Sequence, residues 1–280
     1  MKKMMFVLAL MSLSLLGCEQ APKDATRVST ASSNVSVLPF EFMLEELDRQ
    51  RTVRLYLPPD YETSTQAYPV LYMHDGQNVF DDATSYAGEW AVDESLNRLA
   101  ASSNLRLIVV AIDNGGDYRM NELSPWENKR FGVAQGKQYM DFIVDVVKPY
   151  IDSNYRTLAD VQHTAIMGSS MGGLISHYAI HAYPQVFSKA GIFSPSYWYS
   201  SEVFEFTQLH KTELNAKLYV MYGDKEGDGM IADTDRMQRQ LKTQGHPLSH
   251  MVFKRVVGGE HNEKLWRSEF AEAIQWLFAD

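Results

Sequence analysis

The sequence predicts one α/β domain with a mostly parallel central sheet, an antiparallel N-terminal edge and helices on both faces. From residue 37 to residue 280, short apolar runs alternate with segments of helical period, and no linker separates them. The middle runs are continuously apolar, which is typical of strands covered on both faces. The first runs follow one another without a helix between them, which indicates hairpin-like strands at one edge.

Each element is predicted from its local pattern. Short apolar or alternating runs predict strands at Val37–Leu44, Thr52–Leu57, Val70–Met73, Leu107–Ile112, His163–Met167, Lys189–Phe193, Leu218–Tyr222 and Met251–Val256. Helical spacing predicts helices at Val92–Ala101, Met171–Tyr183, Ser201–His210 and Asp233–Gln244, and around the apolar stripes Met140–Val147 and Trp266–Leu277. Segment Asn114–Gln135 fits neither period and is too long for a plain connection, so we expect a functional loop or lid there.

Composition excludes several classes of protein. The chain has 280 residues, 45% hydrophobic and 22% charged, which is an ordinary globular composition. Lys and Arg number 26 against 35 Asp and Glu, so a formal charge of -9 argues against a nucleic-acid partner. A single cysteine, Cys18, excludes an internal disulfide and a cysteine-based zinc site.

The N-terminus has the three-part layout of a secretory signal. Lys2 and Lys3 precede an apolar run from Met4 to Leu16, which is shorter than the roughly 20 residues of a spanning helix. Residues 15–18, Leu-Leu-Gly-Cys, resemble the lipobox of bacterial lipoproteins. The resemblance implies a signal peptide over residues 1–17 and lipidation of Cys18. The alternative is an ordinary signal peptide with an incidental cysteine.

Residues 18–36 are rich in Ser, Thr and Ala and lack an apolar period, so we expect a lipidated cysteine followed by a flexible tether. The folded domain is then expected over residues 37–280. Glu19 after the cysteine resembles lipoproteins that are sorted to the outer membrane. The expected location is the bacterial cell envelope, held to the membrane through the lipid on Cys18 and facing the periplasm.

A G-x-S-x-G motif lies between a predicted strand and a predicted helix, at Gly168-Ser169-Ser170-Met171-Gly172. Small residues are required where a strand turns sharply into a helix and projects a nucleophile above the sheet. Ser170 is therefore a candidate nucleophile. The alternative is a glycine-rich turn that packs a helix closely against the sheet.

A serine hydroxyl needs a base to take its proton and a carboxylate to orient that base. Among the histidines after Ser170, His261 lies in a loop between the last strand and the last helix, where it can reach over the sheet. We expect His177 and His181 to be surface or core residues, His210 and His246 to be solvated, and His250 to start a strand. The acid is expected after the strand 218–222, where the chemistry alone does not choose among Asp224, Glu226 and Asp228.

Four motifs together resemble the esterase D-like branch of the α/β-hydrolase superfamily, which includes feruloyl, acetylxylan and siderophore esterases and mycolyltransferases. They are Met73-His74-Asp75-Gly76-Gln77-Asn78-Val79-Phe80, Gly168–Gly173, Gly223-Asp224-Lys225-Glu226-Gly227 and Gly259-Glu260-His261-Asn262. The resemblance covers about Val37 to Asp280 and implies an α/β-hydrolase fold. It also implies a catalytic triad of Ser170, Glu226 and His261, with Asp228 as the runner-up acid and Asp224 third.

The same resemblance implies an oxyanion hole formed by the backbone N–H groups of Met171 and Gln77. The loop Asp113–Glu122 resembles one that lines the cleft in relatives, with Arg119 and Glu122 as a candidate ion pair. Candidate substrate-binding residues are Trp90, Tyr118, Arg119, Trp126 and Trp198, and core packing is the alternative for about half of the aromatic residues. His74 and Asp75 lack further spaced ligands, so they are assigned structural roles and no metal is expected.

The expected activity is that of a serine carboxylic-ester hydrolase acting through an acyl-enzyme, without a cofactor. Its expected partners are small-molecule or saccharide esters with acyl or aryl groups, siderophore esters among them. An acyltransferase on the same scaffold is one alternative. A non-catalytic binding lipoprotein of the envelope is the other.

Overall fold

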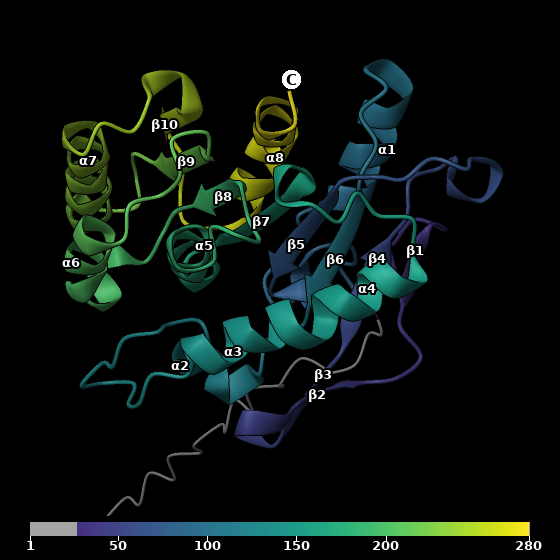
Figure 1. Ribbon diagram of the computed structural model, residues 1–280, viewed down its shortest axis with the longest axis horizontal. Helices are drawn as coiled ribbons and strands as arrows, with labels where there is room; N and C mark the ends of the chain where they lie inside the picture. The colour runs from purple at the N-terminus through teal and green to yellow at the C-terminus, as the bar shows by residue number, and fades with distance from the viewer. Residues whose placement is uncertain (1–26, 280) are drawn as a thin grey trace, which may run out of the picture.

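The computed structural model describes residues 27–279, so the predicted signal peptide and Cys18 lie outside the described residues. An eight-stranded sheet runs through the molecule in the order β1-β4-β6-β5-β7-β8-β9-β10 (Figure 1). Its strands are β1 (Val35–Val37), β4 (Val53–Tyr56), β5 (Val70–His74), β6 (Ile108–Ile112), β7 (Thr164–Ser169), β8 (Lys189–Phe193), β9 (Lys217–Gly223) and β10 (Met251–Val256). The pairs β1–β4 and β4–β6 are antiparallel and the other pairs are parallel, which confirms the predicted sheet with its antiparallel N-terminal edge.

The predicted strand Val37–Leu44 is wrong in detail, because it is divided between two sheets. β1 ends at Val37, and β2 (Phe42–Leu44) pairs with β3 (Arg49–Arg51) in a separate two-stranded hairpin. Pro39 lies between the two strands and has no N–H to donate to a sheet. The apolar run therefore crosses from one sheet to the other at this point.

The predicted boundary between tether and domain also needs correction, because the chain is bonded to the domain from residue 27 onward. The Thr30 hydroxyl donates to Glu89 Oε2 at 2.9 Å, and the Ser32 backbone N–H donates to Asp93 Oδ2 at 2.7 Å. β1 then adds residues 35–37 to the sheet. The segment carries no apolar period because side-chain and backbone hydrogen bonds, rather than apolar burial, hold it in place.

Helices cover both faces of the sheet. They are α1 (Val92–Ser102), α2 (Arg119–Glu122), α3 (Gly136–Phe142), α4 (Lys148–Asn154), α5 (Met171–Ala182), α6 (Glu202–Leu209), α7 (Asp228–Thr243) and α8 (Glu263–Leu277). α1 and α8 pack on one face, whereas α3, α4, α5 and α7 contribute to the core on the other (Figure 1). A π-helical turn, residues 143–147, joins α3 to α4. Within residues 27–279, no helix is both long and apolar enough to cross a membrane.

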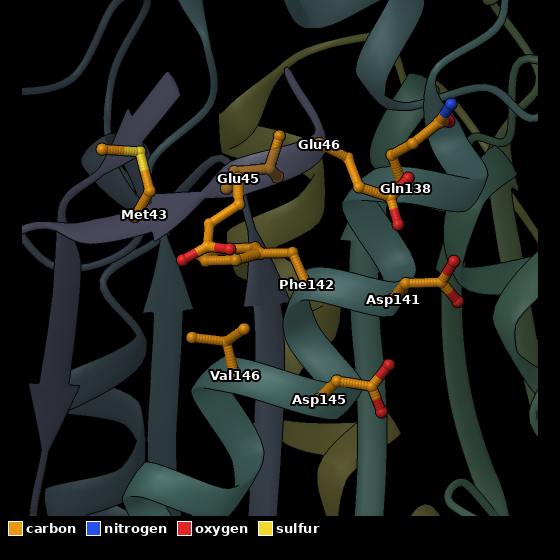
Figure 2. A pocket seen from close by; sticks show the side chains of 9 residues that line it. Met43, Glu45, Glu46, Gln138, Asp141, Phe142, Asp145 and Val146 are labelled. Carbon is orange, nitrogen blue, oxygen red and sulfur yellow. The ribbon is translucent and has the colours of Figure 1, made fainter. Parts of the chain in front are cut away.

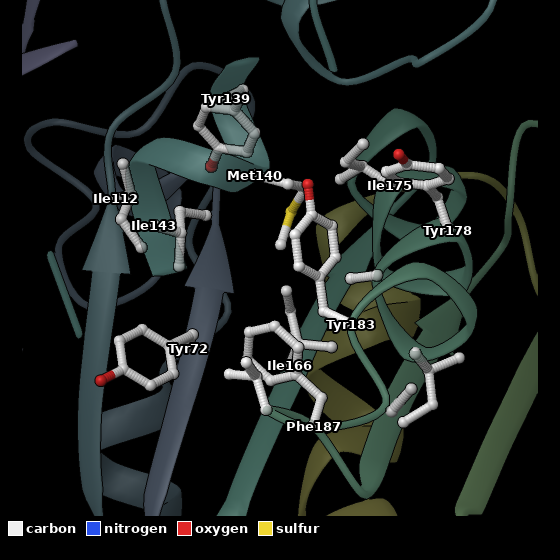
Figure 3. Close-up of a cluster of buried hydrophobic side chains, with 14 of the residues drawn as sticks. Tyr72, Ile112, Tyr139, Met140, Ile143, Ile166, Ile175, Tyr178, Tyr183 and Phe187 are labelled. Carbon is white, nitrogen blue, oxygen red and sulfur yellow. The ribbon is translucent and has the colours of Figure 1, made fainter. Parts of the chain in front are cut away.

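Alternation along the buried strands divides the core into two layers. In β5, Tyr72 faces the layer under α5, while Leu71 and Met73 face the layer under α1 and α8. Figure 3 shows the first layer, in which the Tyr72 ring meets Phe187 edge to face at 6.3 Å between centroids. With both faces buried, the sheet presents only its edges and ends to loops, and the carboxyl ends of β5, β7, β8, β9 and β10 meet at one end.

Several histidines are part of this core. His177 is fully buried, with Nε2 at 2.8 Å from the Thr207 hydroxyl, and His181 Nδ1 donates to the His210 carbonyl. His246, which was expected to be solvated, is buried, because the turn after α7 that carries it lies against the segment between α6 and β9, with Nδ1 3.1 Å from the Thr212 hydroxyl. Burial lowers the pKa of His74 and of His181 from 6.5 to about 4.

We expect these buried histidines to make the folded state sensitive to acid. Below pH 6.5 the unfolded chain binds protons at His74 and His181 while the folded chain does not, so the free energy of unfolding falls as the pH drops from 6.5 towards 4. Each group contributes a slope of up to about 1.4 kcal/mol per pH unit. Urea unfolding at several pH values checks this, and His181→Asn should reduce the slope between pH 6.5 and 4. An unchanged slope in that variant would contradict the prediction.

Candidate active site

Ser170 lies at the sharp turn between β7 and α5. Its backbone has φ 58° and ψ -118°, a strained conformation for a residue with a side chain, and its N–H donates to the Phe193 carbonyl at 2.9 Å. A Cβ on Gly168 would lie 2.8 Å from the backbone of Gly172, and one on Gly173 would lie 2.7 Å from the Phe193 carbonyl oxygen. Close backbone contacts therefore require these glycines at the turn from β7 into α5, which is called the elbow below.

Glu226 is the carboxylate that the fold brings to His261. The Glu226 side chain is fully buried, and the His261 Nδ1–H donates to its Oε2 at 2.6 Å. Of the other two candidates, Asp224 accepts a hydrogen bond from the Gly258 N–H, and Asp228 is exposed as the first residue of α7. Residue chemistry alone did not choose among these three carboxylates, and the geometry pairs Glu226 with His261.

His261 is held by the contact between two loops. A Cβ on Gly223, at the end of β9, would lie 2.2 Å from the Gly259 carbonyl oxygen, so both loops approach backbone to backbone. The imidazole meets the Trp266 ring edge to face at 5.1 Å between centroids and keeps 37% of its side chain exposed. The Asn262 side chain caps α8 by accepting from the Leu265 N–H at 3.1 Å, which fixes where the loop ends.

The Ser170 hydroxyl points to a neighbouring serine. Its Oγ lies 3.2 Å from Ser196 Oγ, and the Ser196 N–H donates to the Ser170 carbonyl at 3.0 Å. Within the described part of the chain, Ser170 forms this side-chain hydrogen bond and not one to His261. Bonds between nucleophile and base are often long before a substrate binds.

Two backbone N–H groups lie free beside the elbow. Among residues 27–279, neither the Met171 N–H nor the Gln77 N–H has a hydrogen-bond partner. Gln77 sits in the turn Gly76–Asn78 after β5, and a Cβ on Gly172 would lie 3.3 Å from the His74 side chain. The turn after β5 and the start of α5 are thus adjacent, with unpaired donors on both.

Arg119 forms an ion pair with Asp75 rather than with Glu122, which corrects the pairing predicted from the loop. The Arg119 Nε–H and Nη2–H donate to the two Asp75 oxygens at 2.6 and 2.8 Å, and Asn114 adds a bond at 2.6 Å. Burial raises the pKa of Asp75. The Arg119 charge and these hydrogen bonds lower it by more than burial raises it, so the net shift is downward. Asp75 itself adopts the left-handed conformation at φ 57°.

Glu122 is buried in a second ionic cluster. The Arg49 Nη1–H donates to its Oε1 at 2.6 Å, and Arg51 donates to both of its oxygens. These arginines lie on β3, a strand far from the loop in sequence, so spacing within the loop could not have identified them.

The five predicted substrate-binding residues divide into two groups. Trp90 and Trp126 are buried, which corrects their assignment as pocket walls: Trp90 stacks on Phe193 at 5.3 Å, and Trp126 meets Tyr178 edge to face. Tyr118 and Trp198 are 50% and 52% exposed. With Arg119, these two residues remain available to a bound molecule.

Sequence reasoning missed four side chains around the candidate triad. They are Ser194, Ser196, Glu263 and Trp266. Ser194 contacts Glu226, Ser196 contacts Ser170, and Trp266 contacts Ser194. Burial raises the pKa of Glu263, the first residue of α8, and the nearby Asp75 charge adds to the shift. The one sequence signal was Ser194-Pro195-Ser196 directly after a strand, at the end of the sheet that carries the loops.

The groove in Figure 2 is separate from the candidate active site. It has a volume of 190 Å³ and is formed between the end of β2, the turn after it, and α3 with the π-helical turn. Four carboxylates line it, from Glu45, Glu46, Asp141 and Asp145, and none of the candidate site residues does. Over residues 27–279, no group of three or more His, Cys, Asp or Glu side chains is arranged to hold a metal ion.

The sheet order, the strained serine at the strand-to-helix turn and the buried acid–histidine pair define an α/β-hydrolase. The family described as "Putative esterase" matches residues 45–277, so this chain belongs to that esterase family and is an esterase-family hydrolase.

The chain is also similar to several curated proteins and, in fold, to solved structures. The "Uncharacterized protein YbbA" of Bacillus subtilis is 28% identical over 81% of this chain and 92% of that protein. An "Endo-1,4-beta-xylanase/feruloyl esterase" of Xylanibacter ruminicola and an "Iron(III) enterobactin esterase" of Dickeya dadantii are each 24% identical, over 85% and 92% of this chain. The chain spans 30% and 58% of their lengths. The crystal structure of the BES protein from Bacillus cereus is similar in fold, with a TM-score of 0.74 at 16% identity over 93% of this chain and all of that one.

Proposed function

We propose that this protein is a serine carboxylic-ester hydrolase in which Ser170 is the nucleophile, His261 the general base and Glu226 the orienting acid. The observation that carries the proposal is the buried Glu226 carboxylate on Nδ1 of a half-exposed histidine, beside a serine held at φ 58°. A carboxylate on Nδ1 fixes the tautomer with a free Nε2 and stabilises the imidazolium that forms during the reaction.

The reaction has two halves. Ser170 Oγ attacks the ester carbonyl carbon as His261 Nε2 takes its proton, and the carbonyl oxygen becomes an oxyanion that accepts hydrogen bonds from the N–H groups of Met171 and Gln77. The carbon–oxygen bond to the alcohol then breaks, and His261 returns the proton to the leaving alcohol. Water attacks the acyl-enzyme with His261 again as the base, which releases the acid and restores Ser170.

For the substrate, we propose acyl or aryl esters of sugars or siderophores. The names of two relatives include a feruloyl esterase and an iron(III) enterobactin esterase. Tyr118 and Trp198 offer exposed flat rings of the kind that stack on aryl groups or sugars. Arg119 keeps Nη1 free of its pairing with Asp75, so it can donate to a polar group of the substrate.

A fluorophosphonate probe tests this function directly, because it reacts with an activated serine whatever the native substrate is. We expect the full-length protein in detergent to gain one probe adduct, located on Ser170 by peptide mass spectrometry, and to hydrolyse a short-chain chromogenic ester. His261→Ala should prevent both reactions in a protein with an unchanged circular dichroism spectrum. A folded wild-type protein that neither reacts with the probe nor hydrolyses the ester would contradict the proposal.

We also propose that Cys18 is lipidated and holds the protein to the bacterial envelope. Eight residues, 19–26, lie between Cys18 and Arg27, whose side chain donates to the Asp82 carbonyl, and a fully extended chain of eight residues spans at most about 29 Å. We expect wild-type protein expressed in bacteria to incorporate radiolabelled palmitate and to sediment with membranes. Cys18→Ala should lose the label, and equal labelling of both proteins would contradict the proposal.

A further inference from the structure

Ser194 occupies a constrained position at the end of β8. It is fully buried, its backbone has φ 44°, and its N–H donates to the Met221 carbonyl at 2.7 Å. A non-glycine residue in this region of backbone space costs free energy that the surrounding structure must offset. The mechanism above gives Ser194 no role, although it lies directly behind the acid.

The Ser194 hydroxyl connects two residues of the site. It donates to Glu226 Oε1 at 2.7 Å and accepts from the indole Nε1–H of Trp266 at 2.9 Å. An indole N–H is only a donor, so it must use a lone pair of the Ser194 oxygen. The single hydroxyl hydrogen is then directed at the carboxylate, and the direction of the bond is fixed by Trp266.

These bonds divide the two oxygens of Glu226 between different tasks. Oε1 accepts from the Ser194 hydroxyl and from the Gly223 N–H at 2.6 Å, while Oε2 accepts, among residues 27–279, only from His261. Two donors on one oxygen fix the rotation of this fully buried carboxylate. Oε2 is therefore presented to the imidazole in one orientation.

We propose that Trp266 and Ser194 form a positioning relay that holds Glu226 in one orientation, and through it holds His261 in place beside the nucleophile. The proposal rests on the proposed function, because it assigns a role within the same site. Both are positioning residues: Ser194 acts on His261 through Glu226, and Trp266 acts through Ser194 and Glu226 as well as by direct contact. Trp266 contributes a second restraint, because its ring also packs edge to face against the imidazole.

Ser194→Ala removes one charge-assisted hydrogen bond and leaves the backbone turn in place. We expect kcat/KM to fall by about 10- to 100-fold with little change in KM, the equivalent of about 1.4–2.7 kcal/mol at about 1.4 kcal/mol per factor of ten. With one donor lost, more of the carboxylate charge acts on His261 and favours the imidazolium. The acid limb of the kcat/KM profile should therefore move to higher pH.

Ser196→Ala is the matched comparison. Ser196 lies two residues further along the same turn, is equally buried, and contacts Ser170 instead of Glu226. We expect this variant to change kcat without moving the acid limb. Trp266→Phe keeps the ring and removes the N–H, so it should move the limb in the same direction as Ser194→Ala but less. In the double variant the two effects should not add, because both act through one hydroxyl.

A measurement that needs no turnover separates failure of the relay from failure of the proposed function. The His261 Cε1–H resonance gives the pKa of the imidazole by NMR titration in wild-type protein, Ser194→Ala and Trp266→Phe. A higher His261 pKa in both variants supports the relay even if no ester is hydrolysed. An unchanged pKa and pH profile in folded Ser194→Ala would overturn it, even with a fully active wild-type enzyme and an inactive Ser170→Ala.

Discussion

Replacing Ser170 by alanine is expected to lower ester hydrolysis by about 10⁴- to 10⁶-fold, the range found when a serine hydrolase loses its nucleophile. The reason is that no other described hydroxyl occupies the strained turn at φ 58° between β7 and α5. Alanine has the same backbone preference as serine there, so the fold should persist. Steady-state hydrolysis of a chromogenic ester, with circular dichroism and thermal unfolding of both proteins, makes the comparison.

Ser169→Ala is the control for this experiment. Ser169 belongs to the same motif and is buried at the end of β7, but its backbone is part of the regular strand. We expect its activity to remain within about threefold of wild type, since a buried Ser-to-Ala change away from the reacting atoms costs one modest hydrogen bond at most. More than a few per cent of wild-type activity in a purified Ser170→Ala protein would assign the reaction to another group.

The second large effect is expected for Glu226→Gln, which should reduce kcat by about 10³- to 10⁴-fold. Glutamine has the same shape, but its amide can present an N–H to the His261 Nδ1–H, and relief of that clash favours the other tautomer. Nε2 would then carry the proton and could not accept one from Ser170. Kinetics of the variant at the pH optimum of the wild type would measure the loss.

Asp228→Asn is the matched variant for the acid. Asp228 is two residues away, carries the same charge and is exposed at the start of α7, so its substitution should change kcat by less than about threefold. If Asp228→Asn were the more damaging of the two, the acid would be Asp228 and the observed Glu226–His261 bond would be a resting arrangement.

The sequence predicted the parts of this molecule that depend on local pattern. Continuous apolar runs marked β5, β6, β7 and β9 because strands buried on both faces have no polar alternation to preserve. The elbow at Ser170 was predictable because only glycine fits the backbone contacts around it. The position of His261 followed from its loop, which joins the last strand to the last helix.

What the sequence could not predict depends on contacts between distant segments. Glu226 differs from Asp224 and Asp228 through the Gly223–Gly259 approach, which no local pattern records. Trp90 and Trp126 are aromatic residues of the kind that line pockets, yet side chains of α8 and α6 pack over them. The sequence of residues 27–36 resembles that of a tether, because hydrogen bonds attach this segment to the domain and such bonds produce no apolar period in the sequence.

That attachment has a mechanical consequence. The carboxylates of Asp81 and Glu89 that bind residues 29–30 lie in the segment directly after the turn of Gln77, and the Thr84 hydroxyl donates to the Gln77 carbonyl at 2.8 Å. A pulling force on the N-terminus is therefore borne first by this segment and only afterwards by β1. In a protein anchored at Cys18, as proposed, tension in the anchor would reach Gln77, the proposed oxyanion donor, before it reached the sheet, so membrane attachment and alignment of the site would be coupled.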